Sequence, residues 1–160
     1  NERDNLGDDL PAEELNILVP GGPIEHYGWP YCYEDGLPNP EYPDAQRCAG
    51  KVGPALEMQA HSAPLGIVFY DHEQFPVEYR GDLFMAFHGS WNRSERTGYK
   101  VVRVEVEDGQ PISYDDFATG WLTESGTVAG RPVAVEVGPE GSLYVSDDGT
   151  GRIWRIRWAG

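Results

Sequence analysis

The run from His88 to Arg93, with the sequence HGSWNR, places an imidazole, a hydroxyl, an indole, an amide and a guanidinium close together. It follows an apolar stretch with the composition of a β-strand, and Lys100 begins the next such stretch. This density of polar and aromatic groups at the mouth of one hairpin exceeds what a simple turn needs. The run therefore favours a functional site over a plain connection.

A second pair of chemically capable residues lies near the C-terminus. Arg131 precedes an apolar stretch, and Asp148 lies in the later turn 147–151. If both residues open central strands, they point toward a shared axis, where a guanidinium can pair with the carboxylates of an anionic cofactor. The alternative is a surface ion pair and an ordinary Asp-Gly turn.

Two further segments carry candidate ligands. Carboxylates and carbonyls on the acidic, Gly-containing N-terminal loop suit calcium, a hard ion that takes six to eight oxygens, although the spacing is not that of an EF-hand. A solvated acidic loop is the alternative. His61 precedes another apolar stretch and either lines a site or lies in a surface turn. The residues of the acidic loop are Asp4, Gly7, Asp8, Asp9, Glu13, Glu14 and Asn16.

Charge and motifs disfavour several classes of function. The formal net charge of −15 argues against nucleic acid as a partner, because phosphate contacts need clustered Lys and Arg, and against an anionic membrane surface. No stretch reaches the roughly 18 apolar residues of a membrane span. The sequence has no HExxH, P-loop, GxSxG or GxGxxG motif, which disfavours the common hydrolases.

The two cysteines, Cys32 and Cys48, are compatible with one disulfide bond. The segment between them is rich in Pro and acidic residues and has no core pattern, so a bridge there would contribute about 3 kcal/mol. Two buried free thiols are the alternative, while a zinc site would need further Cys or His at ligand spacing. A disulfide implies an oxidising, extracytoplasmic compartment, either periplasmic or secreted.

The elements that position these residues are expected to be β-strands. Apolar stretches recur at short intervals, and the chain has 20 Gly and 13 Pro to form the turns between them. The expected strands are 66–70, 82–87, 99–106 and a weaker 117–122, then 132–137, 142–146 and 152–157. The Gly-led segments 81–84 and 141–144 occupy equivalent places about 60 residues apart, which indicates an internal repeat.

This repeat predicts an all-β chain made of about two four-stranded β-propeller blades after a long N-terminal loop region. Two halves of a β-sandwich are the alternative, but both repeats run in the same order. The expected division is 1–60 as a loop-rich, disulfide-stapled continuation of an earlier blade, 61–125 as one blade and 126–160 as a final, incomplete blade. Two blades leave an apolar face and edge strands open, so we expect pairing with missing blades, another chain or a second copy.

Several motifs together resemble the soluble glucose/sorbosone dehydrogenases that depend on pyrroloquinoline quinone (PQQ), in particular the C-terminal part of the sorbosone-dehydrogenase-like branch. The resemblance covers nearly the whole chain. The motifs are Leu6–Asn16, Tyr27–Cys32, His61–Gly66, His88–Arg93, Gly98–Lys100, Gly130–Val133 and Ser146–Asp148.

The resemblance implies a six-bladed propeller whose axial funnel binds PQQ and calcium and which oxidises a sugar at its anomeric carbon. It places Arg131 and Asp148 in the cofactor clamp, with His61 on a lining loop and Arg93 or Lys100 in place of a cofactor-binding lysine. The substrate rim would consist of His88, Trp91 and Asn92. Calcium would bind the backbone carbonyls of Glu2 and Arg3, with Asp8 and Asp9 nearby.

The sequence departs from this family at two points. A second Arg often follows the first by two residues, and here that position is Val133. None of the four histidines matches the catalytic histidine of the family, which lies in an earlier blade. The chain is therefore expected to supply part of the clamp and rim but no catalytic base, and to be inactive alone. Alternatives are a non-catalytic propeller module that binds protein or glycan, and a secreted calcium-dependent hydrolase.

Overall fold

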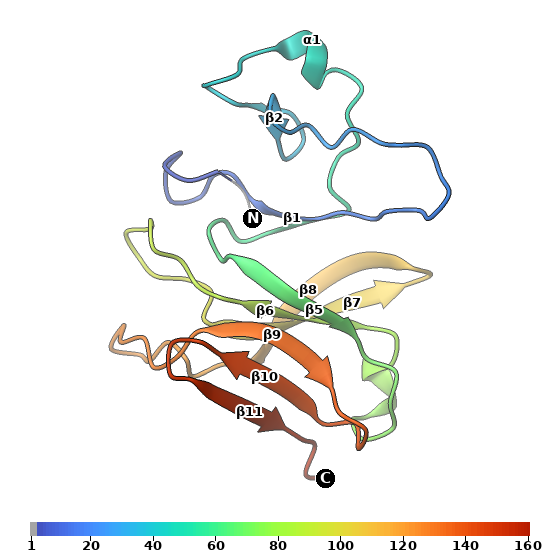
Figure 1. The fold of residues 1–160 in the computed structure, drawn as a ribbon, viewed down its shortest axis with the longest axis vertical. Coiled ribbons are helices and arrows are strands. Elements are labelled where there is room, and N and C mark those ends of the chain that lie inside the picture. The colour runs from blue at the N-terminus through green and yellow to red at the C-terminus, as the bar shows by residue number, and fades with distance from the viewer. Residues whose placement is uncertain (1–2) are drawn as a thin grey trace.

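Two antiparallel sheets that follow each other in sequence form the C-terminal two thirds of the computed structural model, which describes residues 3–160 (Figure 1). The first is a four-stranded meander, and the second has three strands in the order β11-β10-β9. Consecutive meanders of this kind are propeller blades, and the predicted all-β fold class is confirmed. The strands are β5 (Pro64–Phe69), β6 (Leu83–Phe87), β7 (Lys100–Glu107), β8 (Gln110–Ala118), β9 (Pro132–Val137), β10 (Leu143–Asp147) and β11 (Arg152–Ile156).

The burial of each strand follows its residue pattern. All five residues of β6 are buried, as expected for a near-continuous apolar run with both faces covered. In β5 half-buried and exposed residues alternate, because only one face of this strand packs against other parts of the protein. A short 3-10 helix, η1 (Val77–Tyr79), lies between the two strands.

The prediction of a strand at 117–122 is wrong. The fourth strand of the first blade is β8, Gln110–Ala118, which pairs along most of its length with β7. Asp108 and Gly109 both have positive φ, 50° and 76°, so the chain reverses at once in a two-residue hairpin turn. This strand is polar because it lies at the outer edge of the blade, and its apolar pattern is correspondingly weak.

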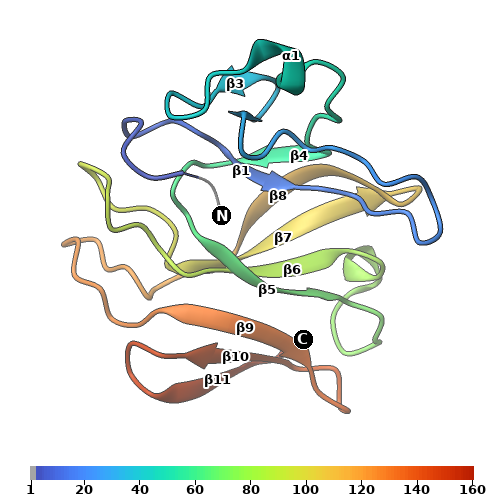
Figure 2. The same ribbon diagram turned by 45° about the horizontal axis from the view of Figure 1, so that its top comes forward.

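The two blades pack against each other through β5 and β9, which lie side by side in both views (Figures 1 and 2). Gly66 makes this approach possible, since a Cβ there would lie 2.5 Å from the Ala134 Cα. Tyr70 extends across the junction and donates its hydroxyl proton to the Gly141 carbonyl at 2.9 Å. The main core belongs to both blades and contains Tyr70, Phe75, Phe84, Tyr99, Val101, Trp121, Val135, Leu143 and Val145.

The N-terminal segment adds a small antiparallel pair, β1 (Glu13–Leu15) with β4 (Leu56–Met58), beside the first blade (Figure 2). A second core cluster joins this pair to the blade and contains Met58, Met85, Phe87 and Val102. Strand β4 also contacts β8. Glu2, a predicted calcium ligand, lies outside the described residues.

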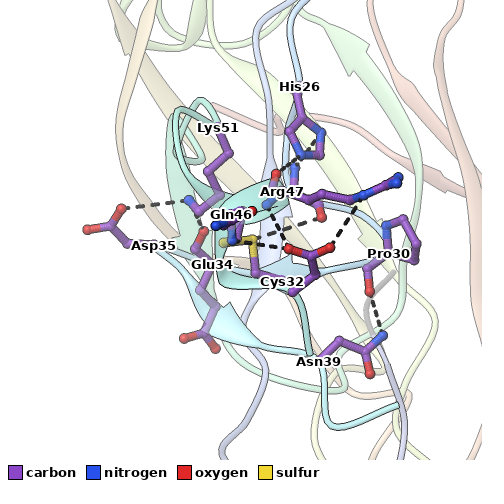
Figure 3. The surroundings of a disulfide bond; sticks show 12 residues. His26, Pro30, Cys32, Glu34, Asp35, Asn39, Gln46, Arg47 and Lys51 are labelled. Carbon is purple, nitrogen blue, oxygen red and sulfur yellow. Dashed lines mark hydrogen bonds and ion pairs between the residues drawn. A yellow bond between two sulfur atoms is a disulfide. The ribbon is translucent and has the colours of Figure 1, made fainter. Parts of the chain in front are cut away.

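The predicted disulfide bond between Cys32 and Cys48 is confirmed, with a Cα–Cα distance of 5.9 Å. It joins the hairpin β2 (Cys32–Tyr33) and β3 (Leu37–Pro38) to the short helix α1 (Ala45–Cys48). Around it His26 Nε2 donates to the Arg47 carbonyl at 2.9 Å, and the Asn39 amide donates to the Pro30 carbonyl at 2.7 Å (Figure 3). The bridge thus ties together a segment with little apolar burial of its own.

Within the described part of the chain, no helix has the length and apolar character that crossing a bilayer requires. The division of the chain at residues 60 and 125 stays a prediction.

Candidate functional site

Three loops and the start of β1 surround a pocket of about 240 Å³ beside the first blade. The predicted residues His61, Trp91 and Asn92 all line it. The indole of Trp91 is 71% exposed at its rim, whereas His61 is buried. The complete lining is Asp4, Glu13, His61, Ala63, Gly89, Trp91 and Asn92.

The first loop is a turn at 61–63 with an unusual backbone. His61 and Ala63 have φ values of 63° and 52°, the left-handed region that residues with a Cβ seldom adopt, at a cost of order 1–3 kcal/mol each. Tertiary hydrogen bonds hold the turn: the Ala63 N–H donates to Glu13 Oε1 at 2.7 Å, and the Ala63 carbonyl accepts from the His88 N–H at 2.9 Å. Strain maintained in this way is typical of functional sites.

The second loop, which connects β6 to β7, interlocks with the first through two of its glycines. A Cβ on Gly98 would lie 2.7 Å from the Gly89 Cα and 2.8 Å from the Ser62 carbonyl oxygen. A Cβ on Gly89 would collide with the Tyr99 ring, whose hydroxyl donates to the Ser90 carbonyl at 2.5 Å. Because these contacts are with backbone or a buried ring, only glycine fits, and the pocket wall has a fixed shape.

Arg131 contacts two residues of this wall, Gly89 and Tyr99. Its Nη2 donates to the Gly89 carbonyl at 3.2 Å, and its guanidinium carbon lies 5.8 Å from the centre of the Tyr99 ring. The Nε atom of Arg131 is buried and has no hydrogen-bond partner among residues 3–160. A buried guanidinium nitrogen without an acceptor is costly, which marks this cation as available to an anionic group.

His88 and Asp148 join the same group. His88 Nδ1 donates to the Pro132 carbonyl at 3.0 Å, and its Nε2 lies 3.8 Å from Asp148 Oδ2. Asp148 is itself 61% exposed. Arg131, His88 and Asp148 therefore gather next to Gly89, which lines the pocket, although none of the three lines the pocket itself.

Asp147, the neighbour of Asp148, fixes the position of Arg131. Its carboxylate is 2% exposed and accepts hydrogen bonds from the Arg131 N–H at 2.8 Å and the Trp154 indole at 3.0 Å. Thr150 donates to it through both its N–H and its hydroxyl, at 3.1 and 2.7 Å. Burial alone would raise the pKa of Asp147, but these four donors outweigh it and lower the pKa from 3.8 to about 2.

This depressed pKa predicts a specific acid sensitivity. The stabilisation is complete above about pH 5, where Asp147 is ionised in both the folded and the unfolded state, and is lost as the pH falls through about 2. We expect the contribution to be about 2 kcal/mol, measured by denaturant unfolding between pH 5 and pH 2. The Asp147→Asn variant should lack this part of the pH dependence, whereas Asp148→Asn at the exposed neighbouring position should retain it. Equal profiles for both variants would contradict the assignment.

The N-terminal loop is fastened across the pocket. The Asn92 amide donates to Asp4 Oδ1 at 3.1 Å. Arg93 donates to the Asp8 carbonyl and lies 3.3 Å from Asp9 Oδ1. The Ser94 backbone N–H donates to the Asp8 carboxylate and lowers the pKa of Asp8. Arg93 and Asp8 therefore have partners within the chain, while Asp9 is 89% exposed.

The remaining predicted residues lie apart from the pocket. Lys100 Nζ forms an ion pair with Asp116 Oδ1 at 2.5 Å on the neighbouring strand. The Arg3 guanidinium contacts Glu41 Oε1 at 2.6 Å, and this carboxylate raises the pKa of Arg3 further. Across residues 3–160, no group of three or more His, Cys, Asp and Glu side chains is arranged to hold a metal ion.

The sequence did not reveal the supporting roles of three residues that build the site. Tyr99 and Asp147 adjoin predicted residues, and Glu13 stood only within the acidic loop. Glu13 lies fifty positions from the Ala63 N–H that it binds, so no local pattern reveals the pairing. For Asp147, the internal repeat that begins with a Gly in each blade could have revealed its position. This repeat aligns the central strands, and Asp147 is the last residue of the central strand β10.

A protein of Borreliella burgdorferi is 36% identical over 159 residues, covering 98% of this chain and 41% of its own length. The calcium structure of a Trichoderma reesei protein of carbohydrate-active enzyme family AA12 matches with a TM-score of 0.74 and 26% identity, over 92% of this chain and 43% of that one.

The holo form of the pyranose dehydrogenase PQQ domain from Coprinopsis cinerea matches with a TM-score of 0.73 and 27% identity, over 99% of this chain and 47% of that one. The chain therefore spans less than half the length of each of these relatives. The family model described as TrAA12-like matches residues 1–159. The chain belongs to the TrAA12-like family.

Proposed function

We propose that this chain is the C-terminal portion of a PQQ-dependent sugar dehydrogenase of the sorbosone-dehydrogenase-like branch. It would supply part of the cofactor clamp and the sugar-binding rim. The observation that carries this proposal is the buried, unpartnered Nε of Arg131 beside a pocket with an exposed indole. Support comes from the holo PQQ domain among the solved relatives.

The donor set fits the cofactor. PQQ carries several carboxylates, and the fork of an arginine pairs with such groups through two parallel hydrogen bonds. Arg131 has one nitrogen bonded to Gly89 and another without an acceptor, so it can bind a carboxylate while staying in place. The proposed clamp consists of Arg131, Asp148, His61, Arg93 and Lys100.

These residues differ in how ready they are for that role. Arg93 and Lys100 already have acceptors within the chain, and Lys100 lies apart from the pocket, so both would have to exchange partners to join the clamp. The calcium proposal rests on the Arg3 and Glu2 carbonyls with Asp8 and Asp9, and on the calcium structure of the Trichoderma reesei relative. When bound, PQQ with calcium supplies the two-electron acceptor for oxidation of the anomeric carbon.

The rim residues of this chain would hold the sugar. The exposed Trp91 ring offers a flat apolar surface to the C–H face of a pyranose. The Asn92 amide and His88 imidazole are hydrogen-bonding groups for sugar hydroxyls. No histidine of this chain is assigned as the catalytic base, so the base and the other blades would come from the remainder of the protein.

The environment we propose is extracytoplasmic, on the strength of the disulfide bond. The partners are a small sugar and the missing blades. The second blade offers a free edge at β11, with Ile153 74% exposed, to which a further strand could pair.

Titration with PQQ in the presence of calcium tests the proposal. The chain is combined with the rest of its protein, and quinone absorbance is followed as PQQ is added. We expect saturable binding that depends on calcium. If no saturable binding is observed with the missing blades present, the non-catalytic propeller module becomes the better account.

A further inference from the structure

We propose that Glu13 is a positioning residue that sets where the His61 imidazole lies in the pocket. This role rests on the proposed function, because the pocket joins His61 of the proposed clamp to Trp91 and Asn92 of the proposed sugar-binding rim. Glu13 is 1% exposed and lies at the start of β1, and both Glu13 and His61 line the pocket.

The action of Glu13 passes through the backbone. Its Oε1 accepts the Ala63 N–H at 2.7 Å, at the end of the left-handed turn that begins with His61. Because His61 and Ala63 both have positive φ, this turn needs external bonds to persist. Glu13 belongs to the strand pair of β1 and β4, outside the turn. Its hydrogen bond therefore fixes the position of the turn relative to β1.

The imidazole has a defined orientation as a result. His61 Nε2 lies 2.8 Å from the Gly7 carbonyl oxygen, and a carbonyl only accepts, so Nε2 carries the proton. In the neutral ring Nδ1 is then the nitrogen with the lone pair. Releasing the Ala63 end of the turn would move the ring from Gly7 and remove this preference.

The neighbouring Glu14 provides a matched control. It lies on the same strand, and its Oε1 likewise accepts a distant backbone N–H, that of Glu34, at 2.6 Å. Successive side chains of a strand point to opposite faces, and Glu14 does not line the pocket. Glu14 therefore makes the same kind of bond on the other side of β1.

The test is the nitrogen spectrum of the His61 ring in the full chain, assigned with the variant His61→Gln among the four histidines. Wild type is expected to show a single Nε2-protonated tautomer. Glu13→Met, which retains volume but removes the acceptor, should give the averaged signals of an unrestrained imidazole. Glu13→Gln retains an acceptor oxygen and should restore the wild-type pattern.

Glu14→Met should lower stability while leaving the His61 signals unchanged. If Glu13→Met does not fold, Glu13→Asp, whose side chain is one methylene shorter and weakens the bond to the Ala63 N–H, should show a partial loss of the pattern. An unchanged His61 spectrum in Glu13→Met or Glu13→Asp, or an equal change in Glu14→Met, would overturn the proposal. PQQ is absent from these measurements, so failure of the PQQ titration is a separate result.

Discussion

Replacing Arg131 with Gln is expected to weaken PQQ binding by about 100-fold, corresponding to the loss of one buried charge-assisted carboxylate interaction. The Arg131 guanidinium is held by Gly89 and the Tyr99 ring, and its Nε has no acceptor within the described chain. Gln retains some polarity but removes both the charge and the fork. Stability should change little, because Asp147 binds the backbone N–H of residue 131 and not its side chain.

Two further variants separate the effect of the charge of Arg131 from the effect of its guanidinium fork and from a general effect of removing an arginine. Arg131→Lys keeps the charge and loses the planar fork, so we expect an intermediate affinity. Arg152→Gln is the matched control, since Arg152 also lies over an aromatic ring, 5.5 Å from the centre of Trp154, but away from the pocket. The measurement is the quinone absorbance titration. Equal PQQ affinity of Arg131→Gln and wild type would remove Arg131 from the clamp.

Local sequence patterns were sufficient for most strands of the blades. The apolar run of β6 is buried on both faces, and β10 buries every second residue, so in both strands the burial follows the sequence pattern. The outer strand β8 was misplaced because edge strands carry polar residues and lose that coincidence. The Asp-Gly pair at positions 108 and 109 is typical of a two-residue hairpin turn, and it indicates better than the apolar pattern where β8 begins.

The candidate site could be predicted only in part. Motifs identified His61, Trp91 and Asn92, and the structure brings these three to one pocket. The supporting contacts could not be predicted, because they join residues far apart in the chain. Glu13 with Ala63 is such a pair, and the position of a buried acceptor depends on how β1 packs against the first blade.

Gly66→Ala is expected to destabilise the chain by about 3 kcal/mol, at the upper end of the cost of overpacking. The added Cβ would lie 2.5 Å from the Ala134 Cα and 2.8 Å from the Val133 carbonyl oxygen. These are backbone atoms of β9, which cannot rotate aside as a side chain would. The two blades must therefore move apart, and the burial of their shared core is reduced.

Gly53→Ala is the control, because its Cβ would meet only Asp35 Oδ1 at an ordinary 3.7 Å. Like Gly66, Gly53 does not have the positive φ that disfavours alanine. We expect this variant to stay within about 0.5 kcal/mol of wild type. The measurement is denaturant unfolding together with hydrogen exchange of the β9 amides, whose protection should fall in Gly66→Ala. If both variants unfold at the same denaturant concentration, β5 and β9 are not in the close contact on which the shape of the site depends.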